Sequence, residues 1–508
     1  MSPPLTSPSS ATKALLTAFA TAAALFVMPS SGHAQSFQEA FGHLFAPREG
    51  VVPPLAPLPD DALHRWNQIA INATGLDHTP VAPGENRIFG EQLGPGRSSR
   101  AMAIVHVAMA DVVSAVTQRF SSYTGVAGQA RSISTEVGIS QAAHDTLVAL
   151  YPSQAPHFNR MLATDLARYR ASAPANINGR DLGRRVAAAI LAMRANDGVT
   201  TPEPVLGTGH ATSNQPGHWR QDPISLIPLA LGAHWGKCLP FVIQSVELYR
   251  TPPPPAMTSA EYTAAFNEAK QLGGDGITTP TQRTAEQTFV GLFWAYDGTP
   301  SLCAPPRLYN QIIMQIAQQR GVDGTDLARL LATANVAMAD TGFAAWDSKY
   351  HWDMWRPIGG IREADVGTGP TGQGDGNPDT VGDANFMPLG APASNLVGPN
   401  FTPPFPAYPS GHAAFGGALF QTLRTFFGTD QVPFVFVSDE FNGVTRDNMG
   451  NVRPLLPRYF SSLSQAEEEN GQSRIYLGIH WSIDKTEGIV QGRRIADYVT
   501  DRIYRLTF

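Results

Sequence analysis

Three segments in the last third of the chain place basic or imidazole side chains at regular spacing in a charge-poor sequence. The first runs from Lys349 to Pro357, with Lys349 and Arg356 almost two helical turns apart. This spacing predicts that both cations project from one helical face and bind one anion together. Lys offers a mobile point charge and Arg a planar fork for two oxygens, and Pro357 ends this helix or begins the next. The competing interpretation is a basic face in solvent.

The second segment contains Pro409, Ser410, Gly411 and His412, followed by small residues. Pro409 and Ser410 are typical of a helix start, and Gly411 allows its N–H to approach an oxygen closely. Unpaired backbone donors and the positive dipole end make such a start an anion site. His412 would lie in the first turn, where the dipole lowers its pKa and suits it to proton transfer. An ordinary capped helix with a packed histidine is the alternative.

The third segment holds Arg474, His480 and Asp484. Six residues place Arg474 and His480 on different faces of a helix, so we expect a break near Gly478 that turns both toward one point. His480 and Asp484 are four apart and can meet, and the carboxylate would then fix the imidazole tautomer. Taken singly, such a pair is also compatible with a purely structural role.

Helices must position these residues, because helical periodicity dominates wherever a period is visible. Apolar stripes occur over residues 101–116, 142–150, 186–193 and 327–338, and loops rich in Gly and Pro over 207–228, 252–255 and 367–404. Strand-like alternation is confined to 433–437, which we expect to form a small hairpin with a turn at Asn442 and Gly443. The sequence therefore predicts an all-α fold.

Composition limits the partners of this fold. The chain has 508 residues, of which 43% are hydrophobic and 15% charged, and its net charge is -6. No long Lys/Arg run interleaved with aromatics is present, so we expect no nucleic-acid partner. Residues 1–34 have the pattern of a signal peptide: Lys13, an apolar stretch over 14–28, and small residues ending at Ala34. No later stretch approaches 18 uninterrupted apolar residues, so we expect an exported protein without a membrane span.

The two cysteines, Cys238 and Cys303, follow no metal-binding or redox spacing. In an oxidising compartment they could pair as a disulfide. Two separate buried thiols are the equal alternative, because free Cys is a common core residue.

Together the three segments spell K-x6-R-P, P-S-G-H and S-R-x5-H-x3-D. This combination resembles the superfamily that joins vanadium-dependent haloperoxidases to type 2 phosphatidic acid phosphatases and bacterial acid phosphatases. Residues 58–508 further resemble the chloroperoxidase branch. Trp346 and Phe405 match aromatics that flank the halide there, and Asp297 matches an Asp that steadies the arginine equivalent to Arg474.

The resemblance implies a fold of two packed four-helix bundles with long irregular loops. We expect an N-terminal helical half over 58–260 and a C-terminal bundle over 280–508, forming one compact unit. The oxyanion site would lie at one end of the C-terminal bundle.

The resemblance also implies vanadate as cofactor. Its oxygens would be held by Lys349, Arg356, Arg474, Ser410 and the Gly411 N–H, and His480 would coordinate vanadium. His412 would assist proton transfers while hydrogen peroxide oxidises halide to hypohalous acid, which small organic acceptors consume. The expected catalytic residues are His412, His480, Lys349 and Asp484.

Two other functions fit the same residues. An exported acid phosphatase would use His480 as the nucleophile on phosphorus, Asp484 to orient it and His412 to protonate the leaving oxygen, because phosphate and vanadate share charge and shape. Phosphate is therefore the competing occupant of the site. A noncatalytic oxyanion-binding protein would need the cations but not the two histidines.

Overall fold

A computed structural model describes residues 36–48, 58–169 and 171–507, and the predicted signal peptide lies outside them. The described chain is all-α apart from very small sheets, as predicted. The helices of its first half are α1 (Phe37–Phe41), α2 (Ala62–Asp77), α3 (Gly94–Thr117), α4 (Thr135–Leu150), η1 (Pro152–Gln154), α5 (Ala155–Arg168), α6 (Ala173–Met193), η2 (Trp235–Lys237), η3 (Val246–Tyr249) and α7 (Ala260–Gly273).

The remaining helices follow in the second half of the chain. They are α8 (Ala285–Phe293), α9 (Pro305–Arg320), α10 (Gly324–Trp352), α11 (Pro357–Arg362), α12 (Gly411–Phe427), η4 (Asp439–Phe441), α13 (Leu463–Tyr476) and α14 (Ser482–Thr500). The loops predicted over 207–228 and 367–404 contain no helix among these described residues. The division of the chain at residues 260–280 stays a prediction.

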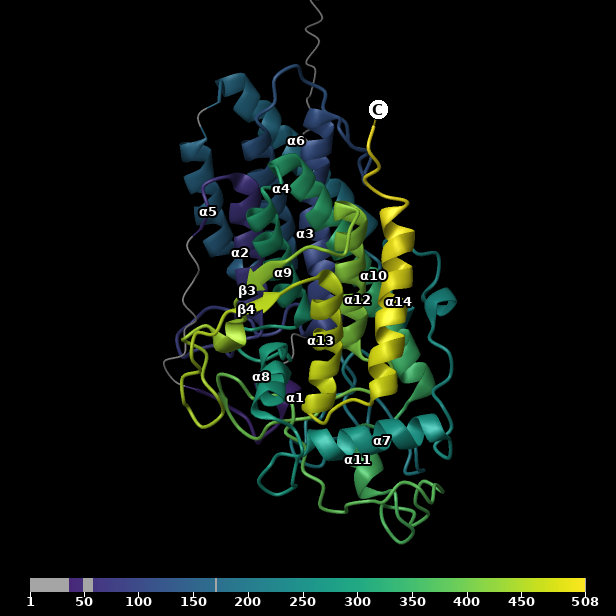
Figure 1. The fold of residues 1–508 in the computed structure, drawn as a ribbon. Helices are drawn as coiled ribbons and strands as arrows, with labels where there is room; N and C mark the ends of the chain where they lie inside the picture. Colours follow the sequence, from purple (N-terminus) through teal and green to yellow (C-terminus); the bar gives the residue numbers. More distant parts are fainter. Residues whose placement is uncertain (1–35, 49–57, 170, 508) are drawn as a thin grey trace, which may run out of the picture.

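Helix α3 forms the centre of the first half, where it packs against α4, α6 and α2 (Figure 1). Nearly all of its residues from Gly94 to Ser114 are buried, so the apolar stripe predicted for 101–116 is one side of a helix that is covered on every side. By length and composition α3 could cross a membrane, but 83% of its most apolar window lies inside the protein. It is a core helix that also contacts α10 of the second half.

Four helices of the second half, α10, α12, α13 and α14, lie side by side (Figure 1). Helices α12 and α14 run parallel and very close, since a Cβ atom on Gly492 would lie 2.0 Å from the carbonyl oxygen of Ala414. Helix α10 runs antiparallel to α12, and a Cβ on Gly342 would contact the ring of Phe415. Helix α13 is also antiparallel to α12, because Arg424 pairs with Glu467. The C-terminal ends of α10 and α13 therefore meet the N-terminal ends of α12 and α14.

The strand predicted over 433–437 is confirmed, but the prediction that a turn at Asn442 and Gly443 closes its hairpin is wrong. Strand β3 (Phe434–Phe436) does form, but its antiparallel partner is the distant β4 (Arg458–Phe460). Ser438 ends β3 by capping η4, where its hydroxyl accepts from the Glu440 N–H at 3.1 Å. The side chain of Asn442 forms a local turn by accepting from two backbone N–H groups. The chain therefore turns at Asn442 as predicted, but no strand follows this turn directly.

The N-terminal segment packs on the long loop before α12. Strand β1 (Ala46–Pro47) pairs antiparallel with β2 (Leu396–Val397). Phe41 and Phe45 each contact the ring of Phe401 edge-on, with centroids 6.3 and 5.9 Å away. This aromatic cluster fixes the segment on one side of the site described below.

Both cysteines are free and buried. Burial raises the pKa of Cys238 to about 12 and that of Cys303 to about 11. Of the two alternatives left open by the sequence, the structure has the separate buried thiols.

Candidate active site

The predicted site residues converge where the ends of α10, α12, α13 and α14 meet. Lys349 lies in the last turn of α10 and is fully buried. Helix α10 ends at Trp352, because Asp353 adopts a left-handed conformation with φ 51°. Arg356 is the N-cap residue of α11. The prediction that Lys349 and Arg356 share one helical face is therefore wrong, although the loop still brings both to the same region.

Ser410 and His412 begin α12 as the sequence predicts. Ser410 is the N-cap residue, and its hydroxyl accepts from the Ala413 N–H at 3.4 Å. Its own N–H donates to the Asp484 carbonyl at 2.9 Å and ties α12 to α14. A Cβ on Gly411 would lie 3.1 Å from the Trp346 ring, so a residue without a side chain lets the helix start pack against this ring.

A break near Gly478 separates α13 from α14, as predicted. Helix α13 ends at Tyr476, Gly478 has φ 70°, and α14 begins at Ser482. A Cβ on Gly478 would lie 2.5 Å from the Gly273 carbonyl oxygen, so both the turn and the close approach require glycine. The break turns His480 toward the same cavity as Arg474.

His480 is held from both ring nitrogens. Its Nδ1 lies 2.7 Å from Asp484 Oδ2, and its Nε2 lies 2.9 Å from Arg356 Nη1. Because guanidinium can only donate, Nε2 carries the lone pair and Nδ1 carries the hydrogen. Burial and the positive charge of Arg356 lower the pKa of His480 well below its ordinary value. The ring is therefore neutral, with its lone pair at Nε2.

His412 is held by a backbone carbonyl. Its Nε2 donates to the Ala295 oxygen at 2.5 Å, which leaves Nδ1 as the proton acceptor. Burial lowers the pKa of His412 well below its ordinary value, and the charge of Arg474 lowers it further. The site thus contains two neutral imidazoles with different free nitrogens.

Arg474 pairs with Asp297 in the cavity wall. Arg474 Nη2 donates to Asp297 Oδ1 at 2.5 Å, and both side chains are almost fully buried. Burial raises the pKa of Asp297, and the charge of Arg474 opposes this rise. The contact that the family resemblance implied is therefore present.

Lys349 uses its donors on the protein itself. Its Nζ donates to the carbonyl oxygens of Pro406 and Ala407 at 2.9 Å and of Pro409 at 2.5 Å. Burial and the charge of Arg356 lower the pKa of Lys349 well below its ordinary value. Lys349 therefore fixes the 406–409 loop and adds positive charge from behind the cavity wall.

An apolar cavity of about 70 Å³ opens onto these groups. Its wall contains Asp297, Trp346, Phe405, Gly411, His412, Arg474 and His480, whereas Lys349, Arg356, Ser410 and Asp484 lie outside it. The rings of Trp346 and Phe405 contact each other with centroids 4.9 Å apart. The guanidinium of Arg356 lies over the Phe405 ring, with its central carbon 4.9 Å from the ring centroid.

The donor set fits a tetrahedral oxyanion. Nη2 of Arg356 and both Nε and Nη1 of Arg474 are buried without a hydrogen-bond partner. Burial of this kind is costly unless a ligand completes the bonds. Burial lowers the pKa of Arg356 to about 9 and raises that of Asp484 to about 7. A bound anion would offset the cost of the three buried cations.

Sequence reasoning missed the backbone partners of the site. The Ala295 carbonyl that holds His412 and the carbonyls that hold Lys349 belong to residues whose side chains carry no chemical signal. Tyr296, which lies between Ala295 and Asp297, also lines the cavity. The only feature of the sequence that points to Tyr296 as a site residue is its position beside Asp297.

The fold and the cavity define a helical protein with a buried oxyanion site and two neutral histidines. A family model of the VCPO second helical-bundle domain matches residues 329–507. The vanadium chloroperoxidase of Curvularia inaequalis is 30% identical over 503 residues, covering 82% of this chain and 78% of the relative. The chain belongs to the vanadium haloperoxidase family.

Solved structures share the fold. A bacterial vanadium-dependent iodoperoxidase superposes with a TM-score of 0.68 at 22% identity, over 89% of this chain and 99% of that one. An apo-type bacterial vanadium-dependent chloroperoxidase gives a TM-score of 0.59 at 15% identity, over 80% and 94% of the two chains.

Proposed function

We propose that this chain is a vanadate-dependent haloperoxidase that oxidises halide with hydrogen peroxide to hypohalous acid. The observation that carries the proposal is the set of unpaired, buried guanidinium donors beside two neutral histidines. Arg474 and both histidines line one cavity, and Arg356 contacts His480 from outside its wall. Family membership supplies the cofactor class, since the relatives are vanadium enzymes. When bound, vanadate supplies a Lewis-acidic centre that activates hydrogen peroxide toward halide.

The residues of the chain divide the remaining work. His480 offers the Nε2 lone pair for coordination, and Asp484 holds its tautomer through Nδ1. Arg356 and Arg474 would hold the oxyanion through their free N–H groups, with Lys349 adding charge from behind. The Ser410 hydroxyl and the Gly411 N–H would complete the cage at the start of α12.

Proton transfer falls to His412. With Nε2 donating to Ala295, its Nδ1 carries the lone pair, which would take a proton from hydrogen peroxide and return it later. Trp346 and Phe405 form an apolar wall that would exclude water from the halide.

The test compares two reactions on one preparation. Purified metal-free protein is assayed for bromination of a diketone dye with peroxide and bromide, with and without added orthovanadate, and for hydrolysis of an aryl phosphate without vanadate. We expect bromination only with orthovanadate. Hydrolysis of the phosphate ester without any vanadate-dependent bromination would replace this function by the phosphatase.

We further propose that the mature protein is exported after cleavage behind Ala34. The charged start, the apolar stretch over 14–28 and the small residues before Gln35 support this proposal. Expression of the full chain with a secretion-competent host, followed by N-terminal sequencing of the protein outside the cytoplasm, should give a start at Gln35. Retention of the intact N-terminus inside the cell would contradict it.

A further inference from the structure

One three-residue segment contacts two cavity residues from different helices. The Ala295 carbonyl accepts from His412 Nε2 at 2.5 Å, and Asp297 Oδ1 accepts from Arg474 Nη2 at 2.5 Å. The segment lies in the irregular chain between α8 and α9. Its position therefore sets His412 on α12 and Arg474 on α13 at the same time.

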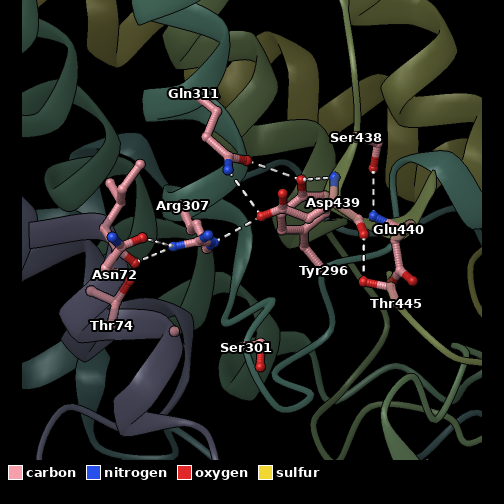
Figure 2. Close-up of polar contacts among 12 residues, drawn as sticks. Asn72, Thr74, Tyr296, Ser301, Arg307, Gln311, Ser438, Asp439, Glu440 and Thr445 are labelled. Carbon is pink, nitrogen blue, oxygen red and sulfur yellow. Dashed lines mark hydrogen bonds and ion pairs between the residues drawn. The ribbon is translucent and has the colours of Figure 1, made fainter. Parts of the chain in front are cut away.

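Tyr296 lies between these two contacts and anchors the segment. It is fully buried and holds a left-handed backbone conformation with φ 45°, which is uncommon for an aromatic residue. Its hydroxyl donates to Gln311 Oε1 at 3.0 Å and accepts from the Asp439 N–H at 2.6 Å (Figure 2). Such a conformation persists only where the surroundings enforce it.

A polar network braces the partners of this phenol (Figure 2). Asp439 Oδ2 accepts from Arg307 Nε and from Gln311 Nε2, each at 2.9 Å. Arg307 in turn donates to the Ile71 carbonyl of α2. The network thus connects α2, α9 and η4 to the segment that carries the two contacts.

A second hydrogen bond holds the start of the loop between α8 and α9. The Ser438 hydroxyl donates to the Phe293 carbonyl at 2.6 Å, just before the segment. Residues 438 and 439 therefore hold the loop at two points on either side of Ala295. The chain beyond β3 acts as a support for the cavity wall.

We propose that Tyr296 is a positioning residue, whose hydroxyl holds segment 295–297 so that Ala295 and Asp297 aim His412 and Arg474 into one oxyanion site. The inference rests on the proposed function for its choice of anion. It predicts that loss of one phenolic oxygen weakens binding of the anion, because the Arg474 contact loosens. We also expect this loss of affinity to depend on Asp297, because Asp297 makes the contact with Arg474.

A double-mutant cycle on orthovanadate affinity tests this route. The variants are Tyr296→Phe, Asp297→Asn and the double variant, and the dissociation constant of metal-free protein for orthovanadate is measured by isothermal titration. We expect Tyr296→Phe to weaken binding about tenfold in the wild-type background, as losses of supporting hydrogen bonds do. In the Asp297→Asn background the same change should weaken binding less than about threefold, because a residue acting through a missing partner is not additive.

Tyr123→Phe serves as the matched control. The Tyr123 hydroxyl also makes an internal hydrogen bond, donating to the Phe241 carbonyl at 2.8 Å, and neither residue lines the cavity. Both phenylalanine variants should lower the urea midpoint of unfolding to a similar extent, but only Tyr296→Phe should change orthovanadate affinity. Gln311→Met, which removes the acceptor of the Tyr296 hydroxyl and one donor to Asp439, should weaken orthovanadate binding in the same direction.

The outcomes separate this inference from the function. Unchanged orthovanadate affinity in Tyr296→Phe and Gln311→Met, or equal losses of affinity in both backgrounds of the cycle, would overturn the positioning role. A tenfold, non-additive loss of affinity would support it even where no bromination is measured, because the titration does not depend on turnover.

Discussion

His412 and His480 share one cavity but are held by different partners. Asp484 and Arg356 hold His480 at both nitrogens, whereas a single carbonyl holds His412. Because the lone pair of His480 is on Nε2, where it accepts from Arg356, and that of His412 is on Nδ1, the two rings are suited to different tasks. The proposed function assigns coordination to His480 and proton transfer to His412.

Substitution of each histidine by alanine should separate these tasks. His480→Ala should lose tight retention of orthovanadate on gel filtration, because the coordinating nitrogen is gone. His412→Ala should retain orthovanadate and lose at least about a hundredfold in turnover, the usual size of an acid–base contribution. Vanadium content per chain and bromination rate measure the two effects. If both variants retain vanadium as wild type does, the site is assigned to the wrong cavity.

For single residues, the sequence predicts local side-chain contacts better than it predicts contacts with distant parts of the backbone. Spacing alone paired His480 with Asp484 and placed Ser410 at a helix start, because these relations are local. The orientation of Lys349 toward three carbonyls was not predictable, since a loop some 60 residues away supplies the acceptors. Any residue type can supply a backbone carbonyl acceptor, so the sequence does not show which residues do so.

Helices α12 and α14 position most of the site through close contact. A Cβ on Gly488 would lie 2.7 Å from the Ser410 carbonyl oxygen, and one on Gly417 would lie 2.6 Å from the Ile489 carbonyl oxygen. Side chains larger than hydrogen at these positions would push the start of α12 away from α14. The distance between His412 and His480 therefore depends on glycines that touch no ligand.

Gly488→Ala should destabilise the protein and weaken the site together. The added methyl must displace backbone, which typically costs about 1–3 kcal/mol. We expect a lower thermal midpoint and weaker orthovanadate binding, measured by calorimetry and by titration. Gly324→Ala is the control, because a Cβ there meets nothing within 4 Å at the start of α10, and it should leave both quantities unchanged or raise the midpoint slightly. Equal changes of thermal midpoint and orthovanadate affinity in the two variants would contradict the role proposed for the close contact of α12 and α14.

Helices were the best-predicted elements, and the connections between them the worst. Periodicity located the apolar stretches of α3 and α10 but not their burial on all sides, which depends on how the two halves pack. The end of α10 at Asp353 was missed because nothing but its left-handed backbone marks it. The partner of β3 was missed because β4 is distant in sequence.

Over the whole molecule, buried titratable groups couple stability to pH. His106 of α3 is buried, and its Nδ1 donates to the Met102 carbonyl at 2.7 Å, while its Nε2 faces the side-chain amide of Asn67 of α2. Burial lowers its pKa from 6.5 to about 4. Between pH 6.5 and pH 4 the unfolded chain binds a proton at this histidine and the folded protein does not. The folded protein is therefore most stable above pH 6.5 and loses stability as the pH falls toward 4.

Acidification should therefore weaken the first half of the chain through His106. Between pH 7 and pH 5 the group should remove about 2 kcal/mol of stability, as linkage gives for a shift of this size. His106→Gln should lose less stability than wild type over the same interval. Urea unfolding at the two pH values, followed by helical circular dichroism, measures the difference. A parallel loss in both proteins would show that His106 does not carry the pH dependence.

The central claim is that one buried site per chain binds vanadate and makes the protein a haloperoxidase. The most direct measurement is a titration of metal-free protein with orthovanadate while the rate of bromide oxidation by hydrogen peroxide is followed. We expect a rate that rises from near zero, saturates at about one vanadium per chain, and falls when phosphate competes for the same cations. A rate independent of orthovanadate, or no bromide oxidation at saturation, would contradict it.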